Sequence, residues 1–180
     1  MPEISQNAIK ATNGTGTAIS LTPSSNTCTA NITNNLSNRN LITNGAFQIA
    51  QKSTSSTDQG LKTVDRWQDG GGGLDENPTQ AQHALTSSDT GPWAKGFRYS
   101  FHLTNGNQTS GAGAADYIDM ATRIEAQDIV NSGWDYTSAS SYLTLSFWVR
   151  SSVAQNFYGF LKTADGTSQS YPFETGSLSA

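Results

Sequence analysis

The chain has few of the residues that catalytic and metal sites use. It contains one cysteine, Cys28, and two histidines, His83 and His102, in 180 residues. A single cysteine cannot form an internal disulfide, so the fold does not depend on oxidation. His-x-x-His, Cys-x-x-Cys and Gly-x-Ser-x-Gly motifs are all missing from the sequence. We therefore expect a protein that is not an enzyme.

Charge is also scarce. Charged residues make up 13% of the chain and the net charge is −4, without any run of Lys and Arg. Binding to a phosphate backbone needs such a cluster, so no nucleic-acid partner is expected. Residues 1–30 contain no secretory signal and no apolar stretch is long enough to span a bilayer, so membrane insertion is not expected either.

The chain does contain 17 aromatic residues and two stretches that alternate between apolar and polar residues. Residues 97–103 and 143–150 each place apolar side chains at every second position. This period of two is typical of a strand with one buried and one exposed face. In the second stretch, Trp148 and Arg150 are predicted to face outward.

Further strands are predicted where apolar residues lie between turn-forming ones, at 41–50, 81–85, 117–125, 157–162 and 167–173. Residues 117–125 also fit a helix, and one helical turn is expected from Ala126 to Val130. The glycines at 70–73 are predicted to form a loop, because glycine loses much entropy in a strand. About eight strands without a repeated βαβ pattern predict an all-β antiparallel sandwich or jelly roll.

The domain organisation follows a change in composition near residue 38. Residues 1–37 are polar and nearly free of aromatics, whereas residues 38–180 hold the strong strand patterns. We interpret 1–37 as an extended N-terminal segment and 38–180 as a β domain. Ile19 and Leu21 alternate with polar residues and are predicted to dock on a partner surface, although a flexible tail is an equal alternative.

Three motifs in order carry a family resemblance. They are Asn40-Leu41-Ile42-x-Asn44-Gly45-x-Phe47-x-Ile49-x-Gln51 with a following Val64-Asp65-Arg66-Trp67, then Arg123-Ile124-Glu125, then Leu143 to Ser151. Together they resemble the jelly-roll module of phage tail-fibre and receptor-binding proteins, which is similar to carbohydrate-binding modules. The resemblance implies a virion protein, made in the host cytoplasm, that docks on other tail proteins through residues 1–37. It also implies a homo-oligomer, most often a trimer.

The resemblance directs attention to a sugar site, because aromatic rings stack on pyranose faces while amides and charges reach the hydroxyls. If the neighbouring strands pair, their outward faces would present Trp148, Arg150, Arg98 and His102. Loop aromatics are second candidates, namely Trp93, Trp134 and Tyr136. The alternative is that a sheet, a loop or another subunit covers Trp148.

Other readings remain open. Four acidic residues close in sequence could form a glycosidase pair or hold a structural calcium ion, although solvated carboxylates are commoner: Asp116, Asp119, Glu125 and Asp128. No other cofactor is expected. The rival functions are a connector or decoration protein of the particle and a polysaccharide depolymerase. Modules of this kind continue past the region that matches 177–180, so either the natural chain extends beyond Ala180 or a neighbouring subunit completes the sheet.

Overall fold

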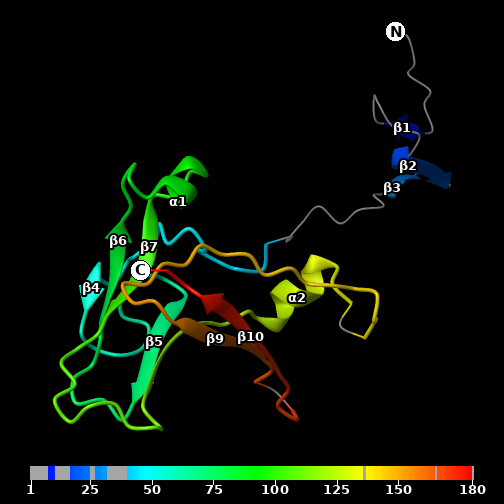
Figure 1. Ribbon diagram of the computed structural model, residues 1–180. Coiled ribbons are helices and arrows are strands. Elements are labelled where there is room, and N and C mark those ends of the chain that lie inside the picture. The colour runs from blue at the N-terminus through cyan, green and yellow to red at the C-terminus, as the bar shows by residue number, and fades with distance from the viewer. Residues whose placement is uncertain are drawn as a thin grey trace.

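The computed structural model describes residues 8–10, 17–24, 27–31, 40–135, 137–164 and 166–179, with only the backbone in the first three ranges. These residues form mostly strands in small antiparallel sheets, with few helices (Figure 1). This agrees with the predicted all-β class. Each sheet has two or three strands.

The N-terminal strands pair with one another. β1 (Ala8–Lys10), β2 (Thr17–Ser24) and β3 (Thr27–Asn31) form an antiparallel sheet in the order β1-β2-β3. The strand predicted around Ile19 and Leu21 is therefore confirmed as the middle strand β2. Because β2 has a neighbour on each side, a further strand could add only at the outer edges of β1 or β3.

A second sheet has the order β4-β6-β7, from β4 (Ser55–Ser56), β6 (Thr79–Ala84) and β7 (Tyr99–Thr104). The strands predicted at 81–85 and 97–103 are confirmed as β6 and β7, with ends shifted by one or two residues. Gln82 pairs with Phe101 in this register. Phe101 is only 7% exposed, so β7 has the buried face that its alternation predicts.

A third sheet joins β5 (Trp67–Gly72) to β8 (Tyr117–Thr122). The prediction of a loop at 70–73 is wrong, because Gly70 to Gly72 lie in β5. Gly70 pairs with Asp119, and a Cβ on Gly70 would lie 2.5 Å from Asp119 Oδ1. Glycine permits this close approach of β8, and the gain in pairing offsets the entropy on which the prediction was based.

The core lies between these two sheets. The Trp67 ring on β5 is 6.4 Å from the Phe101 ring on β7, and Phe47 is 5.0 Å from Trp67. Among the described residues, Val64 and Phe101 are the buried apolar side chains. The core is small, and polar side chains share it.

The strand predicted at 41–50 is wrong. Residues 43–46 form a turn, and Asn44 and Phe47 have φ values of 54° and 56°, which a strand does not allow. Asn44 holds this turn, since its Nδ2 donates to the carbonyls of Ile49 and Asp65 (both 2.9 Å). Ile49 is 50% exposed and does not share a buried face with Phe47.

The C-terminal elements agree better with the sequence. Residues 117–125 begin as strand β8, and α2 (Ala126–Ser132) then ends at Gly133 with φ 77°. The strands predicted at 157–162 and 167–173 are confirmed as β9 (Asn156–Lys162) and β10 (Ser170–Ser177), which pair with each other as a hairpin. Figure 1 shows this hairpin in orange and red.

The prediction of a paired strand at 143–150 is wrong. The chain is extended there but pairs with no described strand. Its side chains are exposed, with Leu143 at 43% and Phe147 at 53%. Alternation made the segment strand-like, but no neighbouring backbone lies in register to form a ladder.

Candidate functional site

The short helix α1 (Thr90–Ala94) lies between β6 and β7 and carries Trp93. The amides of Lys95 and Gly96 donate to the carbonyls of Pro92 and Trp93. Gly96 then adopts φ 90°, a value that ends a helix and that glycine permits. The chain turns back at this point into β7, so Trp93 and Arg98 lie close together.

Arg98 stacks on Trp93. The guanidinium carbon is 3.9 Å from the centre of the indole ring, a cation–π contact. The NH1 group donates to the carbonyls of Trp93 (3.1 Å) and Phe97 (2.8 Å). These contacts fix the orientation of Arg98, and they also cover one face of Trp93.

Residues 148–150 also contact α1 and the residue before it. Trp148 packs on the backbone of Gly91, where a Cβ would lie 2.5 Å from the indole Cζ3. Arg150 NH1 lies 2.6 Å from Asp89 Oδ1, immediately before the helix. The Thr86 amide donates to Asp89, and this bond together with Arg150 lowers the pKa of the Asp89 carboxyl. The ionised Asp89 therefore anchors Arg150.

The two histidines of the sequence meet on the same sheet. The rings of His83 on β6 and His102 on β7 are 5.0 Å apart, edge to face. Desolvation of the ring lowers the pKa of His102 below its ordinary value, and the charges of His83 and Arg150 lower it further. His102 is therefore mostly uncharged at neutral pH.

A hollow of about 480 Å³ lies beside α1, within the size range of ligand sites. It is lined by Gln48, Ala84, Leu85, Trp93, Arg98 and Tyr99. Tyr99 is 36% exposed and offers a ring to this hollow, while Gln48 and Arg98 offer hydrogen-bond donors. The arrangement suits a ligand with one apolar face and several hydroxyls.

Four of the seven predicted sugar-site residues thus gather around α1, namely Trp93, Arg98, Trp148 and Arg150, whereas His102 lies against His83 and senses only the charge of Arg150. Trp134 does not join them, since it follows α2, where its Nε1 donates to Ser141 O, and α2 lies apart from α1 (Figure 1). Tyr136 lies outside the described residues. The side chains of Ile19 and Leu21 are also outside the description.

Sequence reasoning missed Asp89, Gln48 and Leu85. Asp89 was visible only as a turn residue in the loop before Trp93, and no spacing links it to Arg150, 61 residues later. Tyr99 was predicted to face inward with Phe101, but it lies at the start of β7, where the sheet ends and the hollow begins.

Apart from the hollow, a cluster of polar side chains is buried where β5 and β6 meet. Gln80 accepts a hydrogen bond from Thr63 Oγ1 (2.9 Å) and donates to Asp69 Oδ1 (2.6 Å). The Gly60 amide also donates to Asp69 Oδ1 (2.9 Å). Asp69 is 2% exposed, and its Oδ2 has no partner, so burial raises the pKa of the carboxyl. This cluster joins β5 to β6, and Thr63, Asp69 and Gln80 are all buried.

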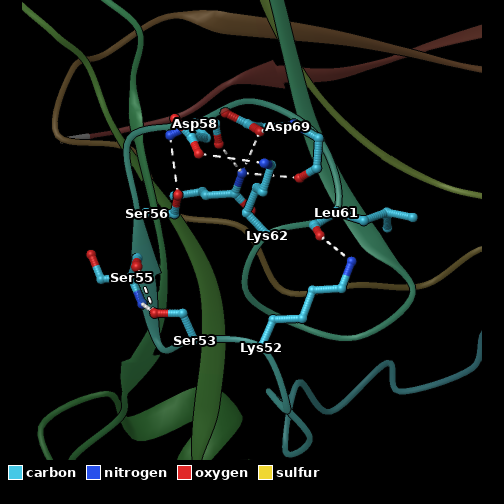
Figure 2. Close-up of polar contacts among 10 residues, drawn as sticks. Lys52, Ser53, Ser55, Ser56, Asp58, Leu61, Lys62 and Asp69 are labelled. Carbon is cyan, nitrogen blue, oxygen red and sulfur yellow. Dashed lines mark hydrogen bonds and ion pairs between the residues drawn. The ribbon is translucent and has the colours of Figure 1, made fainter.

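The loop before β5 surrounds this cluster (Figure 2). Lys52 Nζ donates to Leu61 O (2.6 Å), and Lys62 Nζ lies 3.4 Å from Asp58 Oδ2. The carbonyl of Asp58 accepts a hydrogen bond from Gln80 Nε2 (2.7 Å). These contacts hold the loop against the buried side-chain amide of Gln80, so the cluster stabilises the fold.

The four acidic residues considered for catalysis or calcium lie in different surroundings, and Asp116 and Glu125 each have a partner of their own. Asp116 accepts from the Gly113 amide, Asp119 lies over Gly70, and Glu125 Oε1 is 2.6 Å from Arg66 NH1. Asp128 lies in the first turn of α2. Within the described part of the chain, no three His, Cys, Asp or Glu side chains come together to hold a metal ion.

Comparisons of the chain with descriptions of protein families, with curated proteins and with solved structures found no match. In the described ranges, no helix has the length and apolar character needed to cross a bilayer.

Proposed function

We propose that the protein is a structural component of a phage tail fibre or appendage that contacts host-surface glycans. In this proposal residues 1–37 attach it to other virion proteins, and residues 38–180 form a jelly-roll domain. The order of the three sequence motifs and the antiparallel, strand-rich architecture support it. The contact of Trp67 on β5 with Phe101 on β7 supports a sandwich of two layers.

One observation carries the glycan part of the proposal. Ala84 of β6, Trp93 of α1 and Tyr99 of β7 line a single hollow, and the segment 148–150 contacts α1 and the residue before it, although these residues are far apart in sequence. Arg98 covers one face of Trp93, so Tyr99 and Trp148 are the better platforms for a sugar ring. Trp148 remains 57% exposed despite its contact with Gly91. Stacking on one such ring and hydrogen bonds from Arg98 and Gln48 would hold a pyranose.

Binding of the full chain to an array of bacterial surface polysaccharides tests this proposal. Tyr99→Ala and Trp148→Ala are expected to weaken binding about tenfold or more each, since each removes a stacking ring. Trp134→Ala is the matched control, because Trp134 lies away from α1, and it should bind as the parent does. Absence of binding to every polysaccharide would leave the connector or decoration function.

Catalysis is not part of the proposal. Two of the carboxylates that could serve in a glycosidase pair have other partners, since Asp116 accepts from the Gly113 amide and Glu125 pairs with Arg66. Release of reducing ends from a bound polysaccharide would overturn this point and favour the depolymerase.

Attachment through residues 1–37 has its own test. The outer edges of β1 and β3 offer sites where a strand of another tail protein could add. A chain that lacks residues 1–30 should fail to enter particles while it still binds glycan. Normal incorporation of this shortened chain would contradict the attachment role.

A further inference from the structure

Residues 142–150 form an extended segment whose backbone has no partner among the described residues. None of its amides or carbonyls takes part in a hydrogen bond with another described residue. Nine residues of strand-like chain therefore present two free edges. Backbone groups in such an edge are a template for a further strand.

Side chains nevertheless hold the segment in place. On one face, the Phe147 ring lies 6.2 Å from the Phe173 ring of β10. On the other face, Trp148 packs on Gly91 and Arg150 binds Asp89. The segment is thus already ordered before any partner arrives, which lowers the entropic cost of pairing.

We propose that residues 142–150 pair with the same residues of a second copy of this chain, antiparallel about a two-fold axis at Ser146. In this register Leu143 lies opposite Val149 and Leu145 lies opposite Phe147. The four apolar residues of each copy then share one face with Phe173, and they extend the apolar layer that the Phe147–Phe173 contact begins.

The composition of the segment favours a second copy as its occupant. Residues 142–149 carry no charge, so two copies bring no like charges together. Tyr142, 83% exposed, comes opposite Arg150 of the second copy, and the pair can form a cation–π contact. A charged strand from an unrelated partner would gain no complementary charge from these eight residues.

Exposed aromatic rings of the segment supply about half of the area that a standard interface needs. Tyr142, Phe147 and Trp148 are 83%, 53% and 57% exposed. These three rings alone offer about 300–500 Å² per copy, against about 800 Å² per partner in a standard interface. A two-fold contact uses the same edge of both copies, so it forms a closed dimer and does not build a fibre. It predicts a dimer in place of the trimer that the resemblance implies.

Light scattering after size exclusion tests the pairing with the full chain. The parent is expected to be a dimer, and Ser146→Pro should raise the dissociation constant at least about 100-fold, because proline has no amide to donate and blocks the ladder. Ser146→Ala is the matched control, since it keeps the amide, and it should remain dimeric. The Ser146 amide has no partner among the described residues, so Ser146→Pro should leave circular dichroism and the melting temperature unchanged.

Cross-linking tests the register in a Cys28→Ser background, which removes the native thiol. Ser146→Cys should form a disulfide between copies on mild oxidation, because opposed Cβ atoms lie about 5 Å apart. Thr144→Cys should not, since the two residues 144 would be about 13 Å apart along the strands. A monomeric parent, an oligomer unaffected by Ser146→Pro, or equal cross-linking at both positions would overturn the proposal. The outcome does not depend on whether the protein binds glycans.

Discussion

Two regions of this protein differ in how they use apolar residues. Residues 40–125 contain every buried side chain of the described chain, including Val64 at 1% and Phe101 at 7% exposure. Residues 126–179 contain none, and aromatic residues such as Tyr158 and Tyr171 are 80% and 71% exposed. The first region buries apolar side chains against one another, whereas the second leaves its apolar side chains exposed.

The contrast is sharpest between β7 and residues 143–150, which share the same alternating pattern. β7 pairs with β6 and buries Phe101 against Trp67. The later segment has equally apolar residues but pairs with none of the strands in the described part of the chain. Alternation therefore predicts the extended conformation, and pairing depends on whether another backbone lies alongside.

The largest expected effect compares one phenylalanine from each region. Phe101→Ala should cost about 3–5 kcal/mol of unfolding free energy, because it leaves a cavity beside Trp67. Phe147→Ala should cost less than about 1 kcal/mol in the monomer, since Phe147 is 53% exposed. Urea unfolding of both variants under monomeric conditions measures the difference. Equal losses would show that the second region also has a folded core.

The next effect concerns the buried polar cluster. Gln80→Ala should cost about 2–4 kcal/mol, because Thr63 and Asp69 both lose a hydrogen-bond partner while buried. Gln82→Ala is the matched control, since it removes one bond, to Phe47 O, and should cost about 1 kcal/mol. The midpoints of thermal unfolding rank the two variants. A larger loss for Gln82→Ala would contradict the role given to the cluster.

A smaller effect is expected at the turn that replaces the predicted first strand. Asn44→Ala should cost about 2 kcal/mol, through lost side-chain bonds and the strain of φ 54° on alanine. Asn44→Gly loses the same bonds but tolerates this φ, so it should cost about 1 kcal/mol. If both variants lose equal stability in urea, backbone strain does not matter at this position.

The smallest effect is the pH dependence contributed by Asp69. Burial raises the pKa of its carboxyl above the ordinary 3.8, so the folded state binds this proton more tightly than the unfolded state. Its stabilising contribution is complete below pH 3.8 and is lost as pH rises through the folded pKa. Asp69→Asn removes this loss, so its stability relative to the parent should increase from pH 4 to pH 7. A constant difference across that range would mean that Asp69 does not titrate there.

The site was predictable in part. Trp93, Arg98, Trp148 and Arg150 were expected from residue type and from their place in loops or on outward faces, and the structure brings them to α1. We expected strand pairing to bring these residues together. In the structure, Arg150 and Trp148 are held there by side-chain contacts with Asp89 and Gly91. Asp89 and Gln48 could not be found in the sequence, because their positions depend on loops that fold against distant elements.

The sequence by itself determined the local conformations with strong periodicity or turn chemistry: β6, β7, β8, the β9–β10 hairpin and the end of α2 at Gly133. Tertiary structure decided the rest. It placed Gly70 to Gly72 in a strand because Asp119 needs space there, and it turned the chain at Asn44 because Ile49 and Asp65 offer carbonyls. Propensity acts within a few residues, whereas pairing and close approach depend on neighbours that only the folded chain supplies.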